Sequence, residues 1–381
     1  MHTVAEIIRH SKAYHCLDCG KCTSICPVAR VNRSYSPRSL LMRCVQKDHV
    51  SVLKDRSLWD CLTCGLCELR CPSQIRYIEF MRNIRQLAIM DGVRAECSHG
   101  GAFQSLNRIM TAANLKQNRM DWLTADLKIS QKGDYLYFVG CAPYFDVFFS
   151  ELNVDSLQSV KGTVKLLNKM GVNPIILEDE RCCGHDMLWS GDFDNFKKLG
   201  EHNLKLIRES GAKTVVLSCP EGYQIFSQSY PQFFGNLGFK VVHISQLMSE
   251  KIQSREIVFE AMEKVVTFQD PCRLGRHTGI YDEPRQLLNA IPGISLNEMV
   301  KNRRRSICCG VGNWLTCGST AKTIQANRFR EAKQVEADVL ITACPKCEIH
   351  YKCALQDKKL KDEVQLEVKD LITLAAEVLA K

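Results

Sequence analysis

The stretch "CLDCGKCTSICP", residues 16–27, has the same cysteine spacing as "CLTCGLCELRCP", residues 61–72: both are C-x2-C-x2-C-x3-C-P. Three cysteines at intervals of three residues can surround one metal cluster. The fourth cysteine is directed away by the proline that follows it and can reach a second cluster. Structural zinc sites use separated pairs of ligands, so this spacing argues against zinc. The two runs therefore predict two clusters that exchange their fourth ligands.

This spacing is that of two [4Fe–4S] clusters in bacterial ferredoxins. Between the runs, Ser36 is expected to cap a helix that starts at Pro37, and helical periodicity resumes over residues 77–90. Residues 1–95 are therefore predicted to form an all-α ferredoxin-like domain, which resembles the α-helical ferredoxins of succinate dehydrogenase and heterodisulfide reductase. The cubane ligands are assigned as Cys16, Cys19, Cys22 and Cys71 for the first cluster, and Cys61, Cys64, Cys67 and Cys26 for the second.

Composition supports a globular protein that uses its thiols reduced. The chain has 381 residues, 21 cysteines and a formal charge of +9. An odd number of cysteines in a chain of this length fits metal ligation better than a disulfide scaffold. No apolar run reaches the roughly 18 to 20 residues of a membrane helix, and charges interrupt the N-terminus where a signal peptide would be apolar. We expect a cytoplasmic protein with no direct membrane insertion.

The remainder of the chain contains an internal repeat of about 125 residues. A helical linker is expected over 96–133, a first module over 134–255 and a second over 256–381. In each module short β-branched runs alternate with helical segments, which predicts α/β modules with parallel sheets. "FVGCAPY" aligns with "FQDPCRL", "RCCGHD" with "ICCGVG", and "VVLSCPEGY" with "LITACPKCE".

The aligned cysteines follow strand candidates, and ligand sites of open α/β sheets gather at the carboxyl ends of strands. Adjacent Cys308 and Cys309 cannot easily bind one tetrahedral metal, but they can bind neighbouring irons, with Gly310 allowing close backbone approach. A larger, irregular iron–sulfur centre is therefore expected in the second module. Its five cysteines are Cys272, Cys308, Cys309, Cys344 and Cys347.

The spacing C-x35-CCG-x34-C-x2-C is similar to the cysteine-rich "CCG" module of the heterodisulfide reductase family. With the ferredoxin-like domain in front, nearly the whole chain resembles the iron–sulfur subunit of the membrane-type enzyme, or a fusion of two small subunits of the soluble enzyme. The resemblance implies a noncubane [4Fe–4S] centre on the five cysteines, which would also be the catalytic site.

The first module departs from this pattern, because Gly222 stands where the second module has Cys347. It retains Cys141, Cys182, Cys183 and Cys219. A noncubane centre, a simpler additional cluster or no cluster remain open there. His185 could be a substitute ligand or proton donor, although an ordinary loop histidine is the simpler interpretation.

Several other residues have simple structural interpretations. Cys44 and Cys97 are expected to be free thiols, and Cys317 and Cys353 are either redox thiols or buried without chemistry. The basic run of Lys301 and residues 303–305 is either a solvated turn or a dock for an anionic thiol or coenzyme A ester. "GVGNW" is not a nucleotide-binding motif.

We expect an oxidoreductase subunit that passes electrons through two cubanes to the noncubane centre, where disulfide or thiol chemistry takes place. The resemblance implies a flavin-bearing iron–sulfur donor subunit or other redox subunits as partners, in a larger anaerobic complex in which electron bifurcation is left open. The alternative is a non-catalytic electron relay in an aromatic acyl-CoA reductase or a quinone-linked dehydrogenase. A zinc-scaffolded nucleic-acid binder would need zinc instead of iron, and no nucleic-acid partner is expected.

Overall fold

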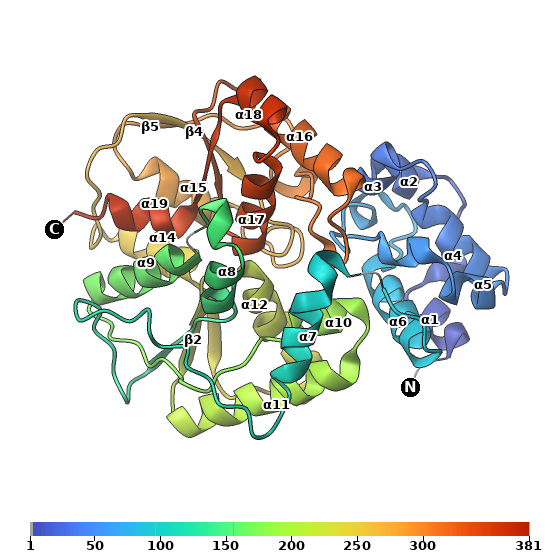
Figure 1. The fold of residues 1–381 in the computed structure, drawn as a ribbon, viewed down its shortest axis with the longest axis horizontal. Helices are drawn as coiled ribbons and strands as arrows, with labels where there is room; N and C mark the ends of the chain where they lie inside the picture. The colour runs from blue at the N-terminus through green and yellow to red at the C-terminus, as the bar shows by residue number, and fades with distance from the viewer. Residues whose placement is uncertain (1–2, 96, 155, 381) are drawn as a thin grey trace. The chain divides into compact units, whose positions relative to one another are not determined.

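The computed structural model describes residues 3–95, 97–154 and 156–380. The chain divides into two compact units that interleave along the sequence (Figure 1). The first unit consists of Met1–Ile109, Gly184–Phe196 and Ile307–Gln325, and the second consists of Met110–Cys183, Lys197–Ser306 and Ala326–Lys381. Two segments that directly follow or contain the Cys-Cys-Gly elements thus belong to the same unit as the ferredoxin-like runs.

The first unit is built from short helices around the cysteine runs. Helix α4 (Pro37–Val45) begins as the sequence predicts, because the Ser36 side chain accepts a hydrogen bond from the amide of Ser39 and Pro37 is the first helical residue. Helix α6 (Tyr77–Met90) coincides with the predicted helical run. The other helices are α1 (Val4–His10), α2 (Lys21–Ile25), α3 (Pro27–Val31), α5 (His49–Leu53), α7 (Ala102–Ile109) and α10 (His185–Ser190), with 3-10 turns η1 (Ala13–His15), η2 (Arg56–Trp59), η3 (Glu68–Arg70), η4 (Ser98–Gly101) and η8 (Gly312–Trp314).

The second unit contains the two repeats, and each repeat has a parallel sheet. In the first, β1 (Tyr135–Phe138) pairs with β2 (Thr214–Leu217), β2 pairs with β3 (Lys240–His243), and Ile175 adds a parallel bridge to β1. In the second, the order is β5 (Ile294–Leu296), β4 (Lys264–Gln269), β6 (Val339–Thr342) and β7 (Glu367–Asp370). The predicted parallel sheets are confirmed. The expected strand in "VNPIIL" is reduced to the single bridge at Ile175.

Helices connect these strands as the alternating pattern predicts. Those of the first repeat are α8 (Ala142–Phe148), α9 (Ser156–Lys169), α11 (Phe193–Ser210), α12 (Pro220–Gln224), α13 (Tyr230–Phe234) and α14 (Ile244–Gln253), with a π turn, η6 (Ile225–Ser229), and a 3-10 turn, η5 (Ser150–Leu152). Those of the second are α15 (Asp282–Asn289), α16 (Ser319–Lys333), α17 (Pro345–Ala354), α18 (Lys358–Val364) and α19 (Leu371–Glu377), with the 3-10 turn η7 (Arg303–Arg305).

The two repeats pack on each other through reciprocal helix pairs. Helix α9 of the first repeat packs against α19 of the second, and α15 of the second packs against α14 of the first; Figure 1 shows α9 alongside α19. Helices α9 and α15 occupy equivalent positions in their repeats, as do α14 and α19. The relationship is that of a pseudo-twofold dimer within one chain. Among the described residues, no helix is both long and apolar enough to cross a membrane.

Candidate metal centres

The two ferredoxin-like runs share an unusual backbone shape. Asp18 and Thr63, each two residues after the first cysteine of its run, have φ of 51° and 48°. Gly20 and Gly65 follow at φ of 73° and 75°. A residue with positive φ turns the chain sharply, which directs successive cysteine side chains inward. The amide of Thr63 donates a hydrogen bond to the Cys61 sulfur at 3.4 Å.

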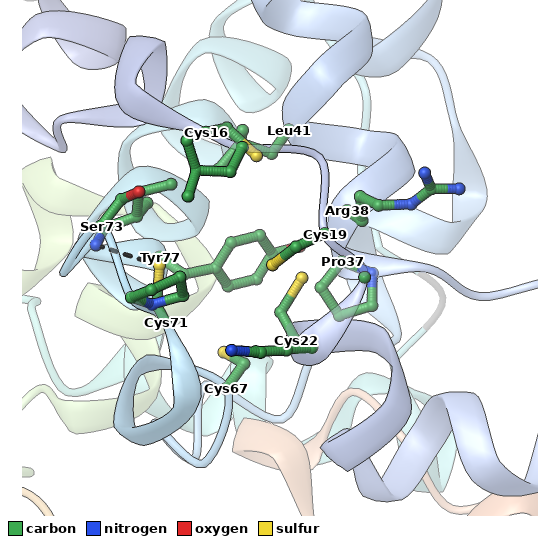
Figure 2. Close-up of a pocket in the computed structure, with 15 residues that line it drawn as sticks. Cys16, Cys19, Cys22, Pro37, Arg38, Leu41, Cys67, Cys71, Ser73 and Tyr77 are labelled. Carbon is green, nitrogen blue, oxygen red and sulfur yellow. Dashed lines mark hydrogen bonds between the residues drawn. The ribbon is translucent and has the colours of Figure 1, made fainter.

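The first predicted ligand set lines one pocket, drawn in Figure 2. Its walls carry Cys16, Cys19, Cys22 and Cys71, the four cysteines assigned to one cubane, together with Cys67. Burial raises the pKa of the Cys16 thiol, and the Cys71 and Cys19 thiols add to that shift. Cys19 and the neighbouring Leu17 are exposed, the latter by 69%. We call this the outer site.

The second predicted ligand set lies deeper. Cys26, Cys61 and Cys64 are only 9%, 7% and 8% exposed. Burial raises the pKa of Cys67 well above its ordinary value, and the thiols of Cys61, Cys64 and Cys26 contribute in that order. The fourth cysteine of the first run therefore lies with the first three of the second, which is the exchange that the spacing predicts. We call this the inner site.

The inner site contains buried polar groups that suit an anionic sulfide-bearing cluster. The hydroxyls of Tyr35 and Tyr77 are buried and have no hydrogen-bond partner among the described residues. Both are close enough to Cys61 that its charge helps to raise their pKa values, after the larger effect of burial. Buried hydroxyls are ordinarily paired, and cluster or cysteinyl sulfur is an acceptor for them. The residues present thus fit an iron–sulfur cluster.

The four cysteines of the first CCG module converge within the second unit. The pKa of Cys183 is raised well above its ordinary value by a hydrogen bond with the Cys182 thiol, by burial, and then by Cys141 and Cys219. Cys141 follows β1 and Cys219 follows β2, and these strands are neighbours. With the Ile175 bridge counted as the second strand, the spatial order is 2-1-3-4, and the connections diverge between β1 and β2. Such a switch point is where α/β sheets bind ligands.

A buried ion pair holds two of these loops together. Arg119 contacts Glu180 at 2.6 Å, with side chains 2% and 0% exposed. Glu180 also accepts a hydrogen bond from the amide of Gly140 at 2.8 Å, and Arg119 donates to the Gly140 carbonyl at 2.6 Å. Burial raises the pKa of Glu180 to about 7, against the opposing effect of Arg119. The pair fixes the residue before Cys141 beside the loop that leads to Cys182.

In the second module, three of the five predicted ligands belong to the second unit. Cys272 lies in the turn after β4, Cys344 caps α17 after β6, and Cys347 lies in the first turn of α17. Because β4 and β6 are adjacent and parallel, Cys272 and Cys344 follow strands that end at the same sheet edge. Cys308 and Cys309 are buried and belong to the first unit, where Gln325 donates a hydrogen bond to the Cys309 carbonyl at 3.3 Å.

The loop after β4 is pinned by its own ion pair. Arg285 contacts Asp270 at 2.8 Å, and both side chains are at most 5% exposed. Asp270 accepts a hydrogen bond from the amide of Arg303 at 2.7 Å, and the Ser306 hydroxyl donates to the Asp270 carbonyl at 3.3 Å. Ser306 is two residues before Cys308 in the chain, and Asp270 is two residues before Cys272. Each repeat thus uses a buried acid–arginine pair for the same task, with residues from different positions.

A buried charged pair joins the two repeats near their cysteines. Lys346 contacts Glu221 at 2.7 Å, with side chains 4% and 8% exposed. Glu221 is two residues after Cys219, and Lys346 is two residues after Cys344, so the two partners occupy equivalent positions. The pKa of Cys219 is raised mainly by burial, then by Glu221 and Cys344, while Lys346 lowers it. Cys219 and Cys344 are therefore near neighbours across the repeat interface.

The remaining candidate residues have other environments. Burial raises the pKa of the Cys44 thiol to about 12, which agrees with a free structural thiol. Cys97 and Cys317 line one cavity of about 360 Å³ in the first unit. His185 is buried, and its Nδ1 lies 3.0 Å from Asp186. Cys353 is half-buried in α17. In the basic run, Lys301 pairs with Glu331 and Arg303 with Asp282, and residues 303–305 form an exposed turn.

Sequence reasoning missed the buried charges around the sites. Arg85 is fully buried although arginine is ordinarily exposed. It occupies the apolar face of α6, four residues after Met81, and that position was the available signal. Glu221 and Lys346 are equivalent in the repeat, and their opposite charges were visible there. Nothing in the sequence pairs Arg119 with Glu180, because the two residues lie in a loop and a connection without repeat equivalents.

Comparison with known proteins agrees with this arrangement. Residues 12–75 match the family model of a 4Fe–4S dicluster domain, and residues 135–223 and 266–352 each match that of a cysteine-rich domain named CCG. The chain is 29% identical to an iron–sulfur subunit of dihydromethanophenazine:CoB–CoM heterodisulfide reductase from Methanosarcina acetivorans, over 96% of this chain and 93% of the relative. It belongs to the heterodisulfide reductase family, as an iron–sulfur oxidoreductase. The resemblance stated from the cysteine motifs is confirmed.

Other similar proteins carry the names of different activities. The chain is 24% identical to a subunit of a CoM/CoB fumarate reductase from Methanothermobacter marburgensis, over 94% of this chain and 72% of that one. It is 30% identical to an EtfAB:quinone oxidoreductase from Syntrophomonas wolfei, over 56% of this chain and 30% of that one. A crystal structure of a hypothetical protein from Helicobacter pylori shares the fold, with a TM-score of 0.58, 10% identity, and coverage of 100% and 77%. The family relationship is therefore broader than one reaction.

Proposed function

We propose that the chain is the catalytic subunit of a heterodisulfide reductase-type complex. Two [4Fe–4S] cubanes at the outer and inner sites, and a noncubane [4Fe–4S] centre on Cys272, Cys308, Cys309, Cys344 and Cys347, would supply one-electron carriers and a site for disulfide chemistry. The balanced reaction is one disulfide plus two electrons and two protons giving two thiols. The observation that carries the proposal is the full five-cysteine CCG set behind two exchanged ferredoxin-like runs.

Differences in exposure support a direction for electron transfer within the first unit. The outer site has an exposed cysteine and the exposed side chain of Leu17 beside it, whereas the inner site has three cysteines below 10% exposure. Electron transfer between proteins needs a short path from the surface. We propose that a flavin-bearing iron–sulfur subunit, or another redox subunit, delivers electrons at the outer site in the cytoplasm.

In this proposal, the protein residues prepare and shield the chemistry. Buried ion pairs at Glu180 and Asp270 keep the cysteine-bearing loops in place before any cluster binds. Apolar burial around the inner site excludes water, which strengthens the electrostatic effects of nearby charges. The four converging cysteines of the first module offer a place for an additional cluster of simpler type, since Gly222 removes the fifth ligand.

A second candidate function is a non-catalytic electron relay. The incomplete first module favours it, because one of two otherwise equivalent sites lacks a ligand. Relay subunits with this role would serve an aromatic acyl-CoA reductase or a quinone-linked dehydrogenase. The two candidates differ in whether the isolated chain, given electrons, turns over a disulfide.

The test is turnover of the CoB–CoM heterodisulfide by anaerobically purified protein with an artificial electron donor. The catalytic proposal expects thiol release that disappears in Cys309→Ser and persists in Cys44→Ala, whose thiol lies outside every predicted ligand set. Electron paramagnetic resonance during thiol titration should change in parallel. Full cluster loading without turnover, in the presence of the redox partners, would favour the relay instead.

A further inference from the structure

Arg85 of α6 is a buried cation at the inner site. Its Nη2 donates hydrogen bonds to the carbonyls of Cys61 at 2.8 Å and Leu58 at 3.0 Å. Its Nε also donates to Leu58, and its Nη1 donates to the carbonyl of Trp189 at 2.9 Å. The side chain is completely buried and lies over the ring of Trp59. One guanidinium thus ties the loop that carries Cys61 to the segment after the first Cys-Cys-Gly element.

All of these acceptors are neutral. Among the described residues, no carboxylate lies within ion-pair distance of the Arg85 guanidinium. Asp60 is the nearest acidic residue that influences it, and its own pKa is raised by burial despite Arg85. Arginine cannot release its proton to escape this environment. A permanently charged group in a dry site requires a counter-charge, and the Cys61 thiolate is the closest one that the inner ligand set provides.

The outer site has no comparable cation among the described residues that line it. Arg38 lines its pocket but is 43% exposed and is paired with Asp18 at 3.0 Å. Lys21, the other cation of that pocket, is also exposed. Water and the Asp18 carboxylate weaken the field of these charges at the outer site. The two sites therefore have similar cysteine loops and different electrostatic surroundings.

The close approach of two chain segments keeps Arg85 in place. Gly191, at φ of 92°, lies so close to α6 that a Cβ on it would be 2.5 Å from the amide nitrogen of Gln86 and 2.6 Å from the carbonyl carbon of Arg85. A side chain at this position would push α10 from α6 and displace the Trp189 carbonyl. The guanidinium is therefore held by backbone packing as well as by its hydrogen bonds.

We propose that Arg85 is a positioning residue that raises the reduction potential of the inner cubane above that of the outer one. Local charge and hydrogen bonding to the ligands are two of the factors that set cluster potentials. A fixed positive charge stabilises the reduced cluster, which carries one more negative charge, more than the oxidised one. Electrons that enter at the outer site would then collect at the inner site. The inference rests on the proposed occupancy of both sites by cubanes.

The experiment is an anaerobic redox titration of the full chain, with the two cubanes followed by electron paramagnetic resonance. Arg85→Gln removes the charge, and we expect it to shift the partition of one electron by at least about tenfold toward the outer cubane, which is about 59 mV for a one-electron couple. Arg85→Lys keeps the charge and should remain within about threefold of wild type. Arg38→Gln, at the exposed pair of the outer site, is the matched control and should shift the partition by less than about threefold.

The outcomes separate the inference from the proposal on which it rests. If wild-type protein lacks two cubane signals, the proposed cofactor content is wrong. If both signals are present and Arg85→Gln shifts neither or shifts both equally, the inference is wrong. Should Arg85→Gln fail to fold, Arg85→Lys decides: a tenfold shift despite the retained charge would mean that hydrogen-bond geometry, and not charge, sets the potential.

Discussion

The two CCG modules are built on the same strand order and the same reciprocal helix pairs, yet equivalent positions near their cysteines carry different residues. Gly222 stands opposite Cys347 in the repeat, and Glu221 stands opposite Lys346. Both modules place a cysteine after the first strand and another after the third. The comparison teaches that the repeated fold supplies the scaffold, while two adjacent positions at the start of one helix set ligand number and charge. The charge difference is compensated by contact between the repeats.

The sharpest test of this comparison exchanges the differing ligand. Cys347→Gly gives the second module the ligand set of the first, and we expect a loss of about four irons per chain, the content of one [4Fe–4S] centre. Gly222→Cys gives the first module the full set and should raise the iron content. The new Cβ would meet only the flexible end of Leu217 at 3.0 Å and the Cys219 Cβ at 4.0 Å. Iron and acid-labile sulfide are measured on anaerobic protein.

Cys353→Ser is the matched control, because Cys353 lies on the same helix as Cys347 and outside every predicted ligand set. Its iron content should equal that of wild type. Equal iron in Cys347→Gly and wild type would contradict the assignment of Cys347 as a ligand.

The second test breaks the charge pair between the modules. Lys346→Met leaves Glu221 buried without its cation, which is expected to cost about 3–5 kcal/mol of unfolding free energy. Glu221→Leu should cost a similar amount. The double variant removes both charges and should recover most of the loss, because a buried ion pair is often replaceable by apolar residues of similar size. Anaerobic urea unfolding of the four proteins gives the coupling energy.

Additive losses in the double variant would show that the two charges act independently. The pair would then not be the compensation between modules that their equivalent positions suggest.

Much of the fold was predictable because its signals are local. The spacing of the ferredoxin-like runs, the cap at Ser36 and the β-branched runs before each cysteine are encoded within a few residues. The segment around Ile175 was overestimated as a strand, because its apolar run pairs with β1 through only one residue. Buried charges such as Arg85 and Glu180 were not predictable, since their partners are carbonyls or side chains far away in sequence. Burial of a charge depends on tertiary contacts that no local pattern records.

A third test uses a difference in the helix caps of the two modules. His243 caps α14 and Asp370 caps α19, and these residues are equivalent in the repeat. Burial lowers the pKa of His243 from 6.5 to about 4. The unfolded chain therefore binds a proton below pH 6.5 that the folded chain binds only near pH 4. Stability should fall by about 2 kcal/mol between pH 7.5 and pH 5 on account of His243. His243→Asn keeps a capping side chain and should remove this loss in urea unfolding at the two pH values.

Asp370 provides a comparison of opposite sign. Burial raises the pKa of its carboxyl, so acidification favours the folded form at this position. Asp370→Asn should therefore enlarge the acid-dependent loss, where His243→Asn reduces it. The same direction of change in both variants would mean that the acid sensitivity arises elsewhere in the chain.

The smallest expected effect concerns the contact of α9 with α19. A Cβ on Gly162 would lie 3.0 Å from the Cβ of Ala376 and 3.2 Å from the carbonyl oxygen of Ile372, and neither atom can move without moving its helix. Alanine in place of glycine should gain about 1 kcal/mol of helix propensity, but overpacking costs about 1–3 kcal/mol, so Gly162→Ala should give a net loss of about 1 kcal/mol. Gly162→Ala with Ala376→Gly moves the missing methyl group to the partner helix and should restore most of the lost packing, whereas a stabilised Gly162→Ala single variant would mean that the two modules have room to separate.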